Sequence, residues 1–304
     1  MAAYLRLVIL SLIVSVSASA ADTLTIVLGG DVLFDRGVRK VINAHGYDHL
    51  FSGIAPVLHE ADAAVVNLEC PLTMRHRSVK KKYIFRGDTI AAAAMHRAGI
   101  THAALANNHS VDQGLLGLVD TWQSLADNNI SAIGYSTSPD NLLMPALIEA
   151  KGITVALFNA VTIPIENWLT LPAEGKPAIC STSADSLAAA VSCFHTARPE
   201  VPIVVFVHWG REFTFGPVMQ QQIGAAALVR AGATAIIGQH PHVVQPQQIL
   251  GRVPVWYSIG NLVFDQKPAE CNKAQLVRLR FTDKGMIGYD TIPVQIEECR
   301  PIAY

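Results

Sequence analysis

The stretch LTIVLGGD, residues 24–31, is a run of apolar and β-branched residues that ends in two glycines and an aspartate. A run of this length and composition predicts a buried strand, and here the strand ends in a carboxylate. The stretch ADAAVVNLE, residues 61–69, repeats this plan and ends in a glutamate. Neither run alternates strictly between apolar and polar residues, which indicates strands that are covered on both faces.

Further apolar runs alternate with alanine-rich segments along the chain. Strands are predicted over residues 101–109, 130–134, 152–160, 201–210, 233–242 and 253–261. Helices are predicted over residues 90–99, 114–129, 183–197 and 217–232. Ser183 or Asp185 can cap the third helix, and residues 136–150 and 161–180 are expected to be loops. The alternation predicts an α/β layered fold, with helices or a second sheet against each face of the strands. No repeat or linker divides residues 21–304, so a single domain is expected.

Composition and charge exclude several classes of protein. A chain of 304 residues that is 51% apolar and 15% charged is too hydrophobic to remain disordered. The formal net charge of −1 lacks the basic excess of a nucleic-acid surface, so no nucleic-acid partner is expected.

The first twenty residues have the pattern of a secretory signal peptide. Arg6 is followed by the apolar stretch 7–16 and then by Ala18-Ser19-Ala20, which predicts cleavage after Ala20. The apolar stretch is about half the length of a membrane-spanning helix. The protein is therefore expected to be exported, periplasmic or extracellular. An uncleaved N-terminal membrane anchor is the alternative.

The cysteine count is odd and contains no CxxC motif: Cys70, Cys180, Cys193, Cys271 and Cys299. Cys70 lies in an apolar context and is expected to be a buried free thiol. The other four could close two loops, Cys180–Cys193 and Cys271–Cys299. The pairing stays open, because four cysteines allow three connectivities.

Polar side chains stand at the carboxyl ends of five predicted strands. These are Asp31, Glu69, Asn107-Asn108-His109, His208 and His240-Pro241-His242. Ligands of open α/β sheets bind in the crevice outside those ends. Two buried carboxylates need partners or a cation there. Imidazole combined with carboxylate and amide oxygen favours Mn, Zn or Fe over Mg or Ca, so the sequence predicts a site for one or two divalent transition-metal ions. Pro241 could fix a turn that aims both neighbouring imidazoles inward.

Six ordered motifs carry a resemblance to a known family. They are GGDVLF (29–34), NLECPLT (67–73), LANNHSVDQG (105–114), HWGREF (208–213), GQHPHVVQ (238–245) and YSIGNLVFDQ (257–266). Over about residues 24–266 the chain resembles the bacterial capsule-synthesis family called CapA or PGA_cap. The resemblance implies a calcineurin-like metallophosphatase fold, a four-layer α-β-β-α sandwich. It also implies a part in poly-γ-glutamate synthesis or export.

The metallophosphatase pattern also implies a ligand set. One metal would be held by Glu69, Asn108, His208 and His240. The other would be held by Asp31, Glu69 and His242, and it lacks one imidazole because Leu33 stands where the pattern has histidine. Asn67 or Asp35 could compensate for that loss.

Other residues receive roles from the same resemblance or from their chemistry. His109 matches the metal-free histidine, which would protonate the leaving group or stabilise charge in the transition state. Arg211 and Arg86 are candidates to bind phosphate or carboxylate, with a structural ion pair as the alternative for each. Glu212 and Asn261 are candidates for the substrate side of the site. Glu212 could instead orient a ligand imidazole, and Asn261 with Gln266 could shape the rim.

Two functions remain open. The first is an exported metal-dependent hydrolase that acts on a phosphoester or a γ-glutamyl amide bond of an anionic polymer. The second is a non-catalytic accessory protein that binds or exports poly-γ-glutamate in the same crevice. Either could work beside a capsule synthase complex at the membrane. The basic cluster RHRSVKKKY (75–83) is a solvated loop or a contact for an anionic polymer or membrane surface.

Overall fold

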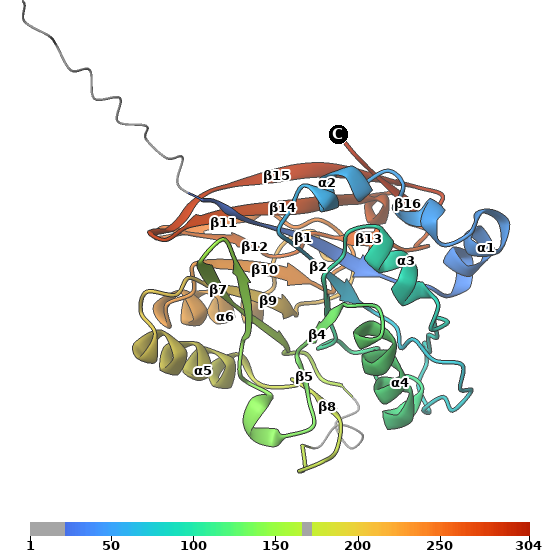
Figure 1. Cartoon of the computed structure of the whole chain (residues 1–304), viewed down its shortest axis with the longest axis horizontal. Coiled ribbons are helices and arrows are strands. Elements are labelled where there is room, and N and C mark those ends of the chain that lie inside the picture. The colour runs from blue at the N-terminus through green and yellow to red at the C-terminus, as the bar shows by residue number, and fades with distance from the viewer. Residues whose placement is uncertain (1–21, 166–171) are drawn as a thin grey trace, which may run out of the picture.

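Two sheets form the centre of the protein in a computed structural model that describes residues 22–165 and 172–304 (Figure 1). The first sheet has the strand order β16 (Arg300–Ala303), β15 (Gly285–Glu297), β14 (Lys273–Thr282), β1 (Leu24–Val32), β2 (Ala63–Leu68), β3 (His102–Ala104) and β4 (Ser131–Ile133), with β13 (Asn261–Val263) paired to β1. The second has the order β11 (Gln247–Leu250), β12 (Val253–Trp256), β10 (Ala235–Gln239), β9 (Ile203–His208), β7 (Ile153–Val161) and β6 (Ala146–Ala150). A short pair joins β5 (Tyr135–Ser136) to β8 (Ala178–Ile179).

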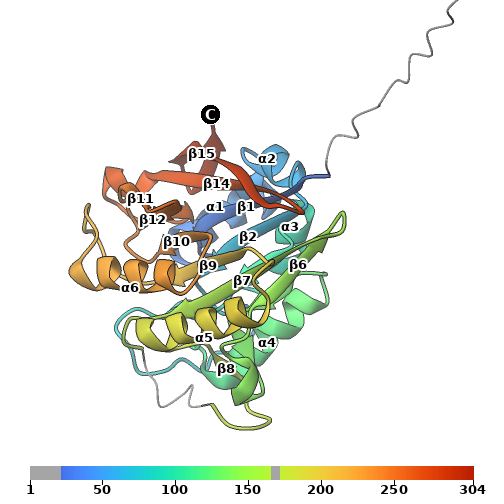
Figure 2. The same cartoon turned by 90° about the vertical axis from the view of Figure 1, so that its left-hand side faces the viewer.

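Helices cover the outer faces of the two sheets (Figures 1 and 2). The first sheet carries α1 (Arg36–His45), α2 (Ala55–His59), α3 (Ala91–Arg97) and α4 (Gly114–Ala126). The second carries α5 (Ala184–Ala197) and α6 (Met219–Arg230), which pack side by side. Short 3-10 turns lie at η1 (Asp48–Phe51), η2 (Pro139–Asn141) and η4 (Ala269–Asn272).

Successive residues of a strand contribute alternately to two hydrophobic cores, one on each face of the sheet. This explains why the strand sequences are continuously apolar. Ile26 of β1 and Phe206 of β9 belong to a cluster made of strand residues from both sheets. Val27 and Val205, their neighbours in sequence, belong to the cluster that contains the helix residues. Successive side chains of a strand point to opposite faces, so both faces of these strands are buried. The four-layer α-β-β-α sandwich is therefore confirmed.

Parallel pairing brings the functional strand ends to one edge. β1, β2 and β3 run parallel in the first sheet, as β7, β9 and β10 do in the second. Gly30 makes the pairing of β1 with β13 possible, because a Cβ there would lie 1.9 Å from the carbonyl oxygen of Gly260. Asp31 thereby comes into register with Asn261.

Most of the helices and strands predicted from the sequence are present in the structure, with a few differences. Ser183 caps α5 by accepting a hydrogen bond from Ser186 N at 3.0 Å. The predicted loop 136–150 contains β6, an edge strand whose partly exposed residues hid its pattern. The predicted loop 161–180 contains the two-residue β8, while residues 166–171 lie outside the described chain. The antiparallel strands β14–β16 were not predicted.

The predictions for the cysteines are partly confirmed, and the prediction for the N-terminal segment is not tested by the structure. All five cysteines are free, so neither possible loop closure is formed, and Cys70 is a buried thiol as expected. The predicted signal peptide, residues 1–20, lies outside the described residues and remains a prediction. In the described part of the chain, no helix has the length and apolar character needed to cross a membrane.

Candidate metal centre

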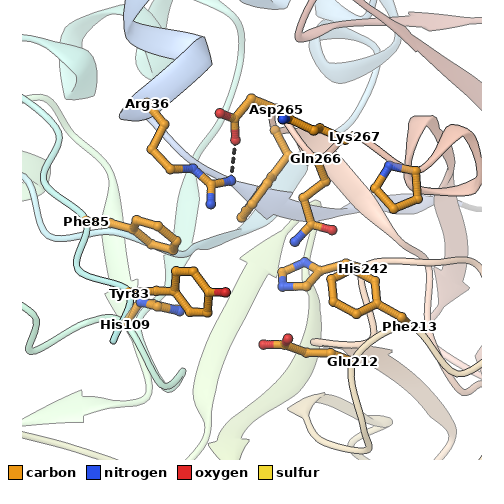
Figure 3. A pocket seen from close by; sticks show the side chains of 12 residues that line it. Arg36, Tyr83, Phe85, His109, Glu212, Phe213, His242, Asp265, Gln266 and Lys267 are labelled. Atoms are coloured by element: carbon orange, nitrogen blue, oxygen red, sulfur yellow. Dashed lines mark hydrogen bonds and ion pairs between the residues drawn. The ribbon is translucent and has the colours of Figure 1, made fainter. Parts of the chain in front are cut away.

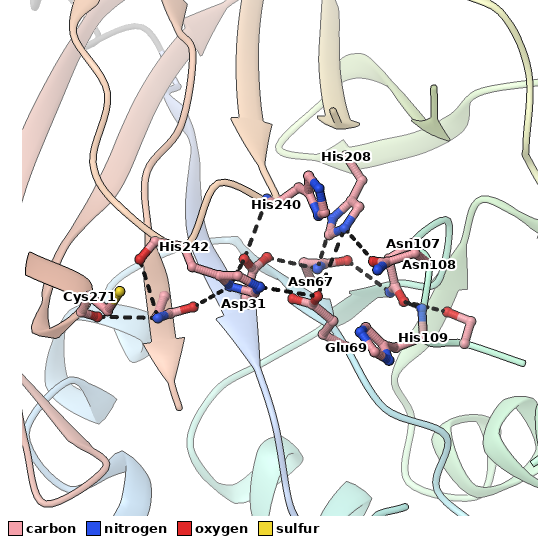
Figure 4. A network of polar contacts seen from close by, with 12 residues as sticks. Asp31, Asn67, Glu69, Asn107, Asn108, His109, His208, His240, His242 and Cys271 are labelled. Atoms are coloured by element: carbon pink, nitrogen blue, oxygen red, sulfur yellow. Dashed lines mark hydrogen bonds and ion pairs between the residues drawn. The ribbon is translucent and has the colours of Figure 1, made fainter. Parts of the chain in front are cut away.

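Five strand ends converge at the edge shared by the two sheets (Figure 4). Asp31 lies near the end of β1, and Glu69 directly follows β2. His208 ends β9, and His240 follows β10. All four side chains are buried.

Two groups of candidate ligands meet at one carboxylate. The ligand atoms of Glu69, His208 and His240 lie within 4.8 Å of one another, and those of Asp31, Glu69 and His242 do the same. Glu69 Oε1 lies 3.9 Å from His208 Nε2 and 3.8 Å from His242 Nε2. These groups are the two sets that the metallophosphatase pattern implied, with Glu69 between them.

Asn108 completes the first group. Its Oδ1 lies 2.9 Å from His208 Nε2, on the open side of the site. The first group can therefore offer four ligands, whereas the second offers three.

The protonation states of the donors suit a divalent ion. Burial lowers the pKa of His208 well below its usual value and the pKa of His240 to about 3, so both rings are neutral. Burial and then the charge of Asp31 raise the pKa of Glu69 well above its usual value. Both Glu69 oxygens are buried and have no hydrogen-bond partner in the described structure. A cation would favour the ionised form of Glu69 and would bind its two unpaired oxygens, so the residues present fit a metal centre.

The His240-Pro241-His242 segment turns both rings into the site. His240 and His242 have φ values of 95° and 58°, a conformation that is uncommon for residues other than glycine. Their ring centroids lie 6.1 Å apart, whereas an extended strand would send them to opposite faces. The expectation that Pro241 belongs to such a turn is confirmed.

Amide side chains hold the candidate ligands in place. Asn67 Nδ2 donates to Asp31 Oδ1 at 2.8 Å, and Asn107 Nδ2 donates to Asn67 Oδ1 at 3.0 Å. Asn261 Oδ1 lies 2.8 Å from His242 Nδ1, which leaves Nε2 of that ring facing Glu69. Asn261 is fully buried, so the structure places it behind a ligand and not at the rim.

The two residues proposed to compensate for Leu33 have other partners. Asn67 is occupied by the amide contacts just described, although it lies within the site. Asp35 caps α1 by accepting from Arg36 N at 2.8 Å, and it also accepts from Arg86 N at 2.9 Å. Leu33 itself is fully buried in the hydrophobic core.

His109 stands beside the ligands in a network that sequence reasoning missed. Its Nδ1 lies 2.7 Å from Asp112 Oδ2, and its ring stacks on Phe85 with centroids 4.1 Å apart. Lys81 Nζ donates to Asp112 Oδ1 at 2.9 Å and also to the carbonyl of Asn108. The spacing of Asp112, three residues after His109, was the one available signal. The contact of Lys81 corrects the view of residues 75–83 as a uniformly solvated loop.

His109 and His242 line an open hollow of about 490 Å³ (Figure 3). We call it the aromatic hollow, because its walls include Tyr83, Phe85, Phe213 and Phe264. Gln266 lines it, as expected for the rim. Arg36, which sequence reasoning missed, lies 4.9 Å over the Phe85 ring and forms an ion pair with Asp265.

The three predicted charged residues have different positions. Arg211 and Glu212 are exposed and line a second hollow with Asn108 and His240, which we call the central hollow. Arg86 points elsewhere, since its Nη1 donates to Thr73 O at 3.0 Å and to Asp88 Oδ1 at 3.2 Å. The structural alternative therefore describes Arg86, and its predicted role in substrate binding has no support from this geometry.

Comparison with known proteins identifies the family of the chain. The family model of the bacterial capsule synthesis protein PGA_cap matches residues 25–266. The chain belongs to the PGA_cap family. The metal-centre residues named above all lie inside the matched region.

Several curated relatives of this PGA_cap chain cover most of its length. The capsule biosynthesis protein CapA of Bacillus anthracis is 27% identical over 286 residues, 92% of this chain and 69% of that protein. The PGA biosynthesis protein CapA of Bacillus subtilis is 27% identical over 285 residues, 92% of this chain and 73% of that protein. A probable polyglutamine synthesis accessory protein of Mycobacterium tuberculosis is 24% identical over 339 residues, 93% of this chain and 87% of that protein.

One solved structure is also similar to the PGA_cap chain. The crystal structure of the protein TT1561 of Thermus thermophilus is 10% identical, with a TM-score of 0.46, and the match covers 89% of this chain and 98% of that one. A likeness of this size supports no argument about the site, which therefore rests on the geometry of the PGA_cap chain itself.

Proposed function

We propose that this PGA_cap protein is a metal-dependent hydrolase that cleaves a phosphoester or γ-glutamyl amide bond in an anionic capsule polymer. One observation carries the proposal. Buried Glu69, whose oxygens have no hydrogen-bond partner in the described structure, is shared by two ligand groups beside the open hollow that contains His109. A purely structural metal would not need that opening.

Divalent transition-metal ions, Mn, Zn or Fe, would supply a Lewis acid and lower the pKa of water from 15.7 to about 7. Glu69, Asn108, His208 and His240 would hold one ion, and Asp31, Glu69 and His242 would hold a second.

His109 and Arg211 would do the remaining work. Asp112 engages Nδ1 of His109, which leaves Nε2 free to exchange a proton with the leaving group. Arg211, exposed at the central hollow, would bind a phosphate or carboxylate of the substrate. Glu212 lies beside it and would limit how closely a second anionic group can approach.

The name of the Bacillus subtilis relative, a PGA biosynthesis protein, favours a glutamate polymer as substrate. Work on such a polymer would place this chain next to a capsule synthase complex at the membrane. The signal-like pattern of residues 1–20 supports export to the periplasm or cell exterior, with an uncleaved N-terminal anchor as the alternative.

A second function is favoured by one departure from the family pattern. Leu33 removes an imidazole from the group of Asp31, Glu69 and His242, which leaves three ligands. A weakened site suits a non-catalytic protein that holds poly-γ-glutamate for export.

Metal content and hydrolysis measured together separate the two functions. The protein would be analysed for bound metal and assayed with a phosphodiester and with poly-γ-glutamate in Mn or Zn. We expect His208→Ala to lose both metal and hydrolysis, and His109→Gln to lose hydrolysis with its metal retained. Metal-independent binding of poly-γ-glutamate without cleavage would support the accessory role instead.

A further inference from the structure

Three hollows join into one groove that passes across the metal centre. The aromatic hollow and the central hollow share Glu212 and Phe213 as lining residues. The central hollow continues into a third, which we call the outer hollow, through the shared residues Ile163, Pro164, Gly210 and Arg211. The outer hollow reaches Ser183 at the start of α5 and Gln220 in the first turn of α6.

The candidate metal centre lies in the middle of this groove. His109 and His242 face the aromatic hollow, while Asn108 and His240 face the central hollow. Free space therefore extends on both sides of the ligands. A site for a small terminal group would need space on one side only.

The volumes exceed the needs of a small substrate. The aromatic, central and outer hollows measure about 490, 520 and 630 Å³. A single pocket that binds a drug-sized ligand has about 300–1,000 Å³. Each hollow alone could thus enclose a small phosphoester, and together they form a path for a longer chain.

Cations are placed along both arms of the groove. Among the described residues, Arg211 is the only charged side chain that lines the outer hollow, and its guanidinium has no ion pair or hydrogen bond with any of them. In the other arm Lys267 is exposed beside Arg36, which the ring of Phe85 and the carboxylate of Asp265 hold in place. Arg36 has φ of 52°, a backbone conformation that is uncommon for residues other than glycine.

From these positions we infer that the groove binds a linear polyanion, a γ-linked glutamate chain, whose units occupy both arms while an internal bond lies at the metal centre. The inference rests on the proposed function for its choice of polymer and deepens it by specifying cleavage within the chain. Arg211 contacts the carboxylates of units on one side of the bond, and Lys267 contacts those on the other. The aromatic walls pack against the methylene groups of the units between them.

Length dependence of binding tests the groove without relying on turnover. The probes are γ-linked glutamate oligomers of one, two, four and eight units with a fluorescent label, titrated by anisotropy at low ionic strength. We expect affinity to rise with length until both arms are filled. Arg211→Gln and Lys267→Gln should each weaken binding of the eight-unit oligomer about fivefold, so that affinity rises less steeply with length in each variant than in the wild type.

Matched exposed cations outside the groove serve as controls. Arg230→Gln at the far end of α6 and Lys284→Gln in the turn between β14 and β15 should leave the affinity of every oligomer unchanged. Equal affinity for all four lengths would overturn the inference. Equal losses in Arg211→Gln and Arg230→Gln would do the same, because the effect would then be one of net charge.

Product size separates this inference from the hydrolase proposal. With Mn or Zn present, cleavage inside the eight-unit oligomer should release fragments of several units. Length-dependent binding without cleavage would support the groove and contradict the hydrolase. Hydrolysis of a phosphodiester by a protein that binds all oligomers equally would contradict the groove and leave the hydrolase standing. Release of single units alone would contradict placement of an internal bond.

Discussion

His109 Nδ1 lies 2.7 Å from Asp112 Oδ2, and both side chains are buried beside the candidate metal centre. Asp112 also accepts hydrogen bonds from Phe85 N at 2.8 Å and from Lys81 Nζ at 2.9 Å. Three donors thus fix the carboxylate, and the carboxylate fixes the orientation and tautomer of the ring. In the proposed mechanism, Nε2 of His109 would act on substrate.

Replacement of Asp112 should impair catalysis and spare metal binding. In Asp112→Asn the ring of His109 loses its anionic acceptor and can adopt the wrong tautomer, so kcat should fall on the order of 10²-fold or more, with KM little changed. Steady-state kinetics with a phosphodiester and elemental analysis of the same sample would measure both effects. Asp120→Asn, which alters an acid bonded to Arg75 near the surface, is the matched control. Normal kcat in Asp112→Asn would contradict this role.

Asn261 should govern occupancy of the second ligand group. Its contact with His242 orients a candidate ligand, and loss of such a supporting contact lowers metal affinity about 10–100-fold. Asn261→Ala should therefore retain the ion held by His208 and lose the one held by His242 at limiting metal. Competition with a chromogenic chelator would give both affinities. Unchanged affinity at both sites would show that Asn261 only packs the core.

The substitution Glu69→Gln should stabilise the metal-free protein and should make the protein less stable than the wild type when metal is present. Without a cation, the buried carboxylate lacks a hydrogen-bond partner in the described structure, so Glu69→Gln should raise the Tm of chelator-treated protein by a few degrees. With metal at a hundred times its Kd, the wild-type protein should gain about 2.7 kcal/mol that the variant lacks. Calorimetry in EDTA and in Mn or Zn would record the reversal. A lower Tm for the variant under both conditions would contradict the account.

His102 should make the metal-free protein less stable in acid. Burial lowers its pKa to about 4, so the folded state favours the neutral ring that the unfolded chain protonates near pH 6.5. The resulting stability is complete above pH 6.5 and is lost as the pH falls from there toward 4, by up to about 3 kcal/mol. Urea denaturation in EDTA should show a smaller loss between pH 7.5 and 4.5 for His102→Gln than for the wild type. The exposed His96→Gln should follow the wild type, and a parallel decline of all three proteins would contradict the prediction.

The sequence predicted which candidate ligands lie together because strand ends are encoded locally. Each of Asp31, Glu69 and His208 comes at the end of a buried apolar run, and parallel pairing then brings those ends to one edge. The absence of polar alternation in the strands predicted only that both of their faces are covered. The four-layer order itself came from the family resemblance, which extends over about residues 24–266.

Residues that reach the site from loops could not be predicted in this way. Lys81 comes from a basic run that resembles a solvated loop, and its contact with Asp112 depends on how that loop folds back. Arg36 begins α1, but the ring beneath it, Phe85, is far along the chain. Asn261 was predicted to lie at the rim, but the structure buries it behind His242. That burial depends on the pairing of β13 with β1, which no local sequence pattern predicts.

Anomalous X-ray scattering from crystals soaked in Mn or Zn tests the shared role of Glu69 most directly. The account predicts a strong peak about 2.0–2.2 Å from a Glu69 oxygen and within bonding distance of His208 and His240, with a second, weaker peak beside Asp31 and His242. Crystals that bind metal elsewhere, with no peak near the Glu69 carboxylate, would contradict it.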